Sequence, residues 1–228
     1  MAPTKSEVEV VLGTGTVGDQ TDPIVKNFYT PAATQEFLSL FRKYGYTRLD
    51  TARVYSPSAP GTSEPLLGQT DFREWAKIDT KIAPYPNLRK NRIPVEIDKS
   101  LEDLKVSKVN IEYLHGMDRQ TPFEETCEAM NAAYQAGKFE KFGLSNATAA
   151  EVEHFMQICE KNNWVKPSVY QGLYNAIARR PEEDLLPVLR KHGISFYAWS
   201  PAAGGMFSGS YSQGKKQGTR GDNGVSFT

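Results

Sequence analysis

Short apolar segments alternate with longer segments of helical periodicity along most of the chain, and this alternation is the strongest constraint on its fold. Successive apolar segments are separated by a segment with helical spacing, an order typical of a parallel sheet with helical crossovers. Connectivity alone allows either a closed barrel or an open, doubly wound sheet. We predict seven strands, at residues 8–12, 46–50, 76–81, 109–115, 141–145, 169–171 and 194–200.

Helix-start signals support the predicted crossovers. Thr30 and Pro31 are of the types preferred at an N-cap and at the first helical position. Capping-box spacing occurs at 121–124 and again at 148–151, and Pro181 is expected to begin a later helix. On the first predicted helix, the apolar stripe expected to face the core consists of Phe37, Leu40, Phe41 and Tyr44.

Polar residues stand at the carboxyl ends of several different predicted strands. They are Asp50, Lys81, His115, Ser145 with Asn146, Gln171 and Ser200. A barrel collects its active site from several strand ends, whereas an open sheet binds its ligand at one switch point. The placement therefore favours a (β/α)8 TIM-type barrel, an α/β fold, of which no eighth strand and helix are found.

Three glycines after the first predicted strand raise the alternative of a dinucleotide-binding turn. Gly13, Gly15 and Gly18 have its G-x-G-x-x-G spacing, but the next helix begins only near Thr30. A dinucleotide-binding turn opens directly into its helix. We therefore interpret the three glycines as a flexible turn at the mouth of the barrel.

Charge and cysteine content exclude several classes of protein. The 27 basic residues balance the 27 acidic ones, so no overall field favours nucleic acid or an anionic membrane. The two cysteines, Cys127 and Cys159, have no metal-binding spacing and are expected to be reduced core thiols. No signal peptide or membrane span is recognised. We expect a cytoplasmic protein without a metal site.

Several segments resemble motifs of the aldo-keto reductases, in the order in which that family carries them. They are Gly45–Tyr55, Gly61–Gly68, Thr80–Lys81, Tyr113–His115 and Gly143–Asn146. The resemblance is strongest to aflatoxin-aldehyde reductases and related fungal reductases, with further matches at 170–176 and 201–205. It implies an incomplete reductase barrel over residues 1–211, followed by a disordered tail at 212–228.

The resemblance implies NADPH-dependent reduction of an aldehyde or ketone to an alcohol, with Asp50, Tyr55, Lys81 and His115 as catalytic residues. A carbonyl that receives hydride needs a proton donor, which would be Tyr55. A free phenol has a pKa of about 10. The ammonium of Lys81, held by Asp50, would lower that pKa. His115 would bind the substrate oxygen. No side chain can supply hydride, so a nicotinamide cofactor, NADP(H), is implied.

The resemblance also assigns the cofactor site. Amide and hydroxyl side chains would bind the nicotinamide carboxamide, and a glycine-containing loop after the seventh strand would wrap the pyrophosphate. The implied cofactor-binding residues are Asp50, Ser145, Asn146, Gln171, Ser200, Pro201, Ala202, Ala203, Gly204, Gly205, Met206, Phe207, Ser208, Gly209 and Ser210.

Two departures from the family pattern leave alternatives open. The family continues for about another hundred residues, with an eighth strand and a segment that clasps the adenine and the 2′-phosphate. Ser210 replaces a usual lysine. An open barrel edge leaves three alternatives: another chain covers it, as in a homodimer, the protein is marginally folded, or the sequence is a truncated gene product. The chain is therefore either a reductase of a small carbonyl substrate, expected in fungal secondary-metabolite biosynthesis, or a weakly active or inactive remnant or binding subunit.

Overall fold

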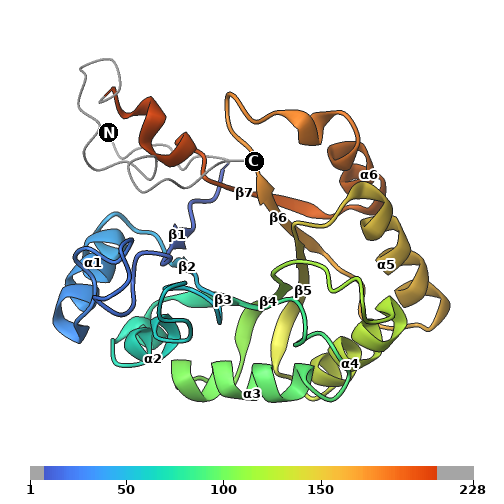
Figure 1. Cartoon of the computed structure of the whole chain (residues 1–228), viewed down its shortest axis with the longest axis horizontal. Helices are drawn as coiled ribbons and strands as arrows, with labels where there is room; N and C mark the ends of the chain where they lie inside the picture. The colour runs from blue at the N-terminus through green and yellow to red at the C-terminus, as the bar shows by residue number, and fades with distance from the viewer. Residues whose placement is uncertain (1–7, 210–228) are drawn as a thin grey trace. The chain divides into compact units, whose positions relative to one another are not determined.

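Seven parallel strands alternate with helices in the computed structural model, which describes residues 8–209 (Figure 1). The strands lie in the sheet in chain order, from β1 to β7. This alternation confirms the predicted α/β fold class, with seven strands and six intervening α-helices of the TIM-type barrel in the described residues. The strands are β1 (Leu12–Gly13), β2 (Arg48–Asp50), β3 (Lys77–Ile82), β4 (Val109–Leu114), β5 (Phe139–Ser145), β6 (Val169–Leu173) and β7 (Ser195–Trp199).

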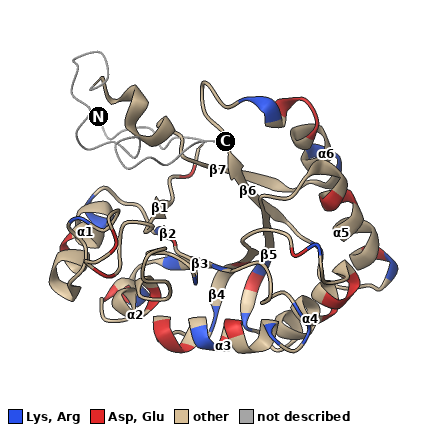
Figure 2. Ribbon diagram, viewed as in Figure 1, with Lys and Arg blue, Asp and Glu red and all other residues tan. Residues whose placement is uncertain are grey.

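Six α-helices separate these strands within residues 8–209. They are α1 (Pro31–Lys43), α2 (Ser63–Leu67), α3 (Ile93–Leu104), α4 (Phe123–Gln135), α5 (Ala149–Lys161) and α6 (Leu185–His192). Short 3₁₀ turns occur at η1 (Phe72–Glu74), η2 (Arg180–Glu182) and η3 (Ala203–Ser208). Charges of both signs are interspersed on helices such as α3 and α5 (Figure 2).

The chain divides into two compact units. The first comprises residues 1–80 and 100–110, and the second comprises 81–99 and 111–228. In the first unit, the parallel register places Asp50 of β2 beside Asp79 of β3. In the second unit, Ser145 of β5 pairs with Gln171 of β6. The predicted tail at 212–228 lies outside the described residues.

Helix α1 begins where its sequence predicts, but it presents a different face to the core. The Thr30 hydroxyl accepts a hydrogen bond from the Ala33 amide at 3.3 Å, as expected of an N-cap. Leu38 is fully buried, whereas Leu40 is 53% exposed and Tyr44 is 71% exposed. The predicted stripe is therefore wrong at Leu40 and Tyr44.

A contact on the opposite flank of α1 explains this rotation. The Gln35 side-chain amide donates to Asp71 at 2.6 Å, and the Asp71 amide donates back to the Gln35 oxygen at 2.9 Å. These bonds hold one flank of α1 against the segment that follows α2. The face with Leu38 then lies in the core, and the face with Leu40 and Tyr44 turns outward.

Local signals predict the ends of other elements with mixed success. The capping box of Thr148 and Glu151 is confirmed at the start of α5. The one predicted at 121–124 is wrong, because the Thr121 hydroxyl donates to Asp118 at 2.7 Å and Pro122 occupies the N-cap. Pro181 is expected to begin a helix but is the second residue of a 3₁₀ turn that begins at Arg180, and α6 starts later, at Leu185.

The core of the second unit includes the packing of α4 on α5. Cys127 and Cys159 are buried and free, which confirms the expected core thiols. The Phe155 ring lies 4.7 Å from that of Phe123 and 6.4 Å from that of Phe142, measured between ring centres. Between residues 8 and 209, every helix is too short or too polar to span a bilayer.

Candidate active site

The first unit brings together two of the four predicted catalytic residues. Asp50 is the last residue of β2 and is 6% exposed, and Tyr55 lies in the loop that follows. The Tyr55 hydroxyl donates a hydrogen bond to Asp50 Oδ2 at 3.1 Å. A turn closed by the Tyr55 amide and the Ala52 carbonyl, at 3.1 Å, folds the loop back toward its strand. These two contacts fix the orientation of the phenol relative to Asp50.

The loop that carries Tyr55 is bound to the loop between β1 and α1. The Asp19 amide donates to Ser56 Oγ at 3.3 Å and to Thr62 Oγ1 at 3.1 Å. The Ser58 amide donates to Asp22 Oδ2 at 2.8 Å. Gly18 lies directly against Ser56, which is buried. The predicted glycine turn is therefore packed against the Tyr55 loop.

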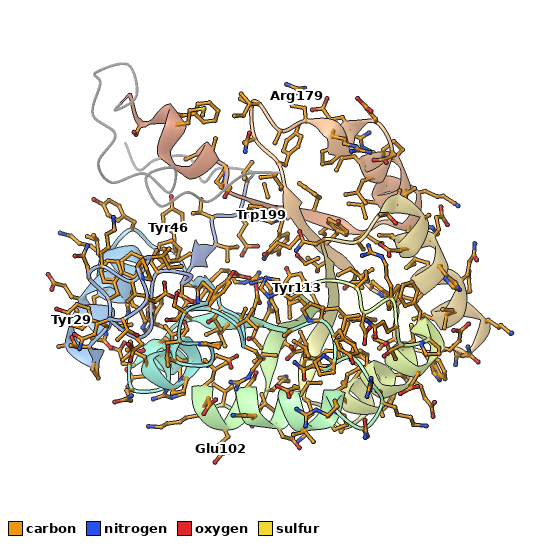
Figure 3. The ribbon with its side chains drawn as sticks, viewed as in Figure 1. Tyr29, Tyr46, Glu102, Tyr113, Arg179 and Trp199 are labelled. Carbon is orange, nitrogen blue, oxygen red and sulfur yellow. The ribbon has the colours of Figure 1, made fainter. Side chains whose placement is uncertain are left out.

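Lys81 is fully buried near the end of β3, with 0% relative exposure. Its ammonium lies 5.8 Å from the ring centre of Tyr113, a fully buried residue of β4 (Figure 3). A lysine is almost never buried to this degree without a functional or structural partner, because desolvation of the charge is costly. Its burial makes Lys81 a functional-site candidate.

His115 follows β4 in the second unit and is half-buried. Its amide donates to the Ile82 carbonyl at 2.9 Å, which ties it to the residue after Lys81. Its carbonyl accepts from the Asn146 side-chain amide at 2.8 Å. The backbone of His115 is therefore fixed between the ends of β3 and β5. Because Asp50 and Tyr55 belong to the other unit, the convergence of all four residues stays a prediction.

Three of the predicted cofactor-binding residues lie together in the second unit. Ser145 and Gln171 are paired in register and almost fully buried. Asn146 adopts a left-handed conformation, with a φ of 57°, and its amide donates to Ser145 Oγ at 3.1 Å. This group combines hydroxyl and amide donors and acceptors, which are the groups needed to bind a carboxamide.

Several residues of the segment after β7 have a left-handed backbone. Ser200, Ala203, Gly204, Gly205 and Gly209 all have positive φ, between 49° and 95°. Two of the N–H groups of this segment are used within it, because the Ala203 amide donates to the Ser200 carbonyl at 2.9 Å and the Gly205 amide donates to the Ala202 carbonyl at 3.0 Å. The Asn175 side chain donates to the Ser200 carbonyl at 3.1 Å and anchors the start of the loop. Binding of a pyrophosphate by this segment stays a prediction, and Ser210 lies outside the described residues.

Sequence reasoning missed a buried polar network beneath Asp50. Asp79 is fully buried and accepts from Arg48 at 2.9 Å and from Asn110 at 2.5 Å. The pKa of Asp79 is raised to about 6, mainly by burial and in part by the charge of Asp50. Arg48 and Asn110 act in the opposite direction and lower the pKa. Arg48 lies within the Gly45–Tyr55 motif, but its pairing with Asp79 could not be read from the sequence, since the contact depends on strand register.

A second missed group surrounds Glu64, whose role was not assigned although it lies within the Gly61–Gly68 motif. Glu64 is fully buried and pairs with Arg53, two residues before Tyr55. Thr80 donates to Glu64 Oε1 at 2.6 Å. The available signal was the position of Glu64, a charged residue, inside a motif segment. The spacing of residues in the sequence could not show which partners Glu64 has.

The sequence is similar to known proteins over most of its length. The sequence profile of the Aldo/keto reductase family matches residues 9–225. Human "Aldo-keto reductase family 7 member A3" is 41% identical over 194 residues, covering 82% of this chain and 56% of the relative. Human "Aflatoxin B1 aldehyde reductase member 2" is 38% identical over 225 residues, covering 95% and 59%. "Oxidoreductase sirO" of Leptosphaeria maculans is 38% identical over 201 residues, covering 86% and 60%. The chain thus spans about three fifths of the length of these relatives.

Proposed function

Because the chain belongs to the aldo/keto reductase family, we propose that it reduces an aldehyde or ketone to an alcohol with NADPH. The observation that carries this proposal is the hydrogen bond from the Tyr55 hydroxyl to Asp50. It holds the phenol in a fixed orientation near the end of a strand, where barrels of this class place their catalytic groups.

In the proposed reaction, Tyr55 donates its proton to the carbonyl oxygen as negative charge develops there. Reduced nicotinamide, when bound, supplies the hydride to the carbonyl carbon. The substrate gains one hydride and one proton and leaves as the alcohol. The phenolate left on Tyr55 is stabilised by the Lys81 ammonium and recovers a proton from water. Asp50 orients the phenol, and His115 donates a hydrogen bond to the substrate oxygen.

The proposed cofactor site uses the residues of the second unit. Ser145, Asn146 and Gln171 hold the carboxamide and thereby set which face of the nicotinamide meets the substrate. The loop of residues 200–209 would hold the pyrophosphate, and Gly204, Gly205 and Gly209, which all have positive φ, would allow the phosphate to approach the backbone closely. Trp199 ends β7 in register with Leu173 and would border the nicotinamide.

The substrate class proposed first is an aldehyde. Relatives from human, mouse and rat are named aflatoxin B1 aldehyde reductases, and other relatives come from fungi. We propose a role in secondary-metabolite biosynthesis, in the cytoplasm. The alternative is a binding subunit of the same fold that takes up cofactor without turnover.

A cofactor titration followed by an aldehyde-reduction assay separates these functions. Quenching of protein fluorescence by NADPH reports binding, and loss of reduced-nicotinamide absorbance with an aldehyde panel reports turnover. Tyr55→Phe is expected to bind cofactor normally and to lose about 10²- to 10⁴-fold in kcat. Tyr134→Phe, a change on the exposed face of α4, is the control and should keep full turnover.

The outcomes of this experiment are distinct. If the unmodified chain and Tyr134→Phe both bind NADPH but neither reduces an aldehyde, the chain is a binding subunit. A flat fluorescence response up to millimolar NADPH would rule out both functions. Turnover that survives in Tyr55→Phe would show that the phenol is not the proton donor.

A further inference from the structure

We infer that the buried pair of Arg53 and Glu64 is a positioning device that holds the Tyr55 loop in its reactive place. Arg53 lies two residues before Tyr55 in the loop after β2, and Glu64 is the second residue of α2. Neither residue is a predicted catalytic or cofactor-binding group. The inference rests on the proposed function, because it assigns the pair to the proton donor of that reaction.

Glu64 is the centre of the device because both of its carboxylate oxygens are used. Its Oε2 accepts from Arg53 Nη1 and, at 3.2 Å, from Ser100 Oγ of α3. Its Oε1 accepts from Thr80 Oγ1 of β3 at 2.6 Å. One fully buried side chain thus joins the Tyr55 loop to a strand and to a helix. A buried carboxylate is tolerated only with such compensation.

The same nitrogen of Arg53 has a second carboxylate partner, Asp103, in the last turn of α3. Its Nη1 donates to Asp103 Oδ2 at 2.7 Å, and its side chain is only 8% exposed. Burial by itself lowers the pKa of Arg53, but Glu64 and Asp103 together raise it above its ordinary value. The guanidinium is therefore charged and fixed between two carboxylates, and the backbone of the loop is fixed with it.

The position of Tyr55 depends on this anchor because its loop has little regular structure. Residues 51–62 lie between β2 and α2, and Ser56 has a left-handed φ of 63° directly after Tyr55. Gly61 also has a positive φ, of 84°, beside the Arg53 guanidinium. A displacement of about 1 Å at a reacting group costs on the order of 10²-fold in rate. An anchor two residues away controls displacements of that size.

The competing explanation is that the pair only stabilises the packing of α2 on α3. Arg73 offers a matched control, since its guanidinium donates to the Gly68 carbonyl at 3.1 Å and to the Leu104 carbonyl at 3.4 Å. It therefore bridges the ends of the same two helices without touching the Tyr55 loop. A purely structural role predicts the same kinetic effect for Arg53→Met and for Arg73→Met.

The decisive experiment compares Arg53→Met, Arg53→Lys and Arg73→Met in steady-state kinetics, each alone and in the Tyr55→Phe background. We expect Arg53→Met to lower kcat by about tenfold to 10²-fold with KM nearly unchanged. Arg53→Lys should recover part of the loss, and Arg73→Met should leave kcat unaltered. In the Tyr55→Phe background, Arg53→Met should cause no further loss, because a residue that acts through the phenol has nothing left to position.

A readout independent of turnover keeps the inference separate from the proposed function. Carbon-13 labelling of the tyrosine ring carbon that bears the hydroxyl gives an NMR signal for Tyr55, assigned by its loss in Tyr55→Phe. Arg53→Met should shift or broaden this signal, and Arg73→Met should not. If the unmodified chain shows no turnover but this pattern appears, the positioning role holds and the reductase proposal fails. Equal effects of the two variants on the signal, or additive losses in the Tyr55→Phe background, would overturn the inference.

Discussion

Gly18 lies so close to Ser56 that a Cβ atom on residue 18 would stand 2.5 Å from the Ser56 Cβ. Gly18 also has a positive φ, of 155°. The β1–α1 loop can therefore pack on the Tyr55 loop only because residue 18 has no side chain. This contact places a packing constraint one residue away from the proposed proton donor.

Gly18→Ala should lower both stability and turnover. The added methyl group must displace Ser56, and we expect a loss of about 1–3 kcal/mol in the free energy of unfolding together with a several-fold fall in kcat. Gly13→Ala is the control, because a Cβ at residue 13 would meet no atom within 4 Å. Urea unfolding and aldehyde reduction measure the two effects. Equal behaviour of the two variants would contradict the packing argument.

Lys81→Met should abolish turnover while Lys77→Met leaves it intact. Both lysines belong to β3, but Lys77 is exposed at its start and Lys81 is fully buried beside Tyr113. Loss of the ammonium removes the charge that stabilises the Tyr55 phenolate in the proposed reaction, and we expect kcat to fall by about 10²-fold or more. Steady-state assays of both variants check this, and comparable activity in the two would remove Lys81 from the mechanism.

The titration of Asp79 should make stability depend on pH. Its pKa is about 6 in the folded chain, against 3.8 for an ordinary aspartate, because the group is buried. A carboxyl group whose pKa is raised in the folded chain stabilises the fold fully at pH values below its unfolded-state pKa. This stabilisation is lost as the pH rises through the folded-state pKa. The free energy of unfolding should therefore fall between pH 3.8 and about 6, by on the order of 2–3 kcal/mol.

Comparison with Asp79→Asn isolates this contribution. The variant cannot titrate at residue 79, so its stability should decline less than that of the unmodified chain over the same pH window. Urea unfolding at several pH values gives both curves. Parallel curves would mean that Asp79 does not carry the pH dependence.

Thr148→Ala should destabilise α5 through loss of its capping box. The Thr148 hydroxyl accepts from the Glu151 amide at 3.2 Å, and the Glu151 carboxylate accepts from the Thr148 amide at 2.7 Å. We expect a loss of about 1 kcal/mol in the free energy of unfolding. Thr148→Ser keeps the hydroxyl and should retain most of the stability, so an equal loss in both variants would argue against the cap.

Features that depend on neighbouring residues were predicted from the sequence. Helical spacing is one such feature: Ile93, Ile97, Leu101 and Leu104 recur at this spacing in the sequence, and all four are buried in α3. Thr30 and Thr148 mark true helix starts because a cap needs only the residues of the first turn. Thr121 has the same spacing but bonds to Asp118 instead, so a local signal fails where another local partner competes.

The sequence by itself determined the alternation of strands and helices, the polar strand ends and the motif that contains Asp50 and Tyr55. Only the tertiary structure decided that Arg53 meets Glu64 and Asp103, and that Arg48 meets Asp79. Periodicity and capping act over a few residues and are therefore visible in the chain. Pairing of buried charges joins residues 11 to 50 positions apart and depends on strand register and on which face of each helix is turned inward.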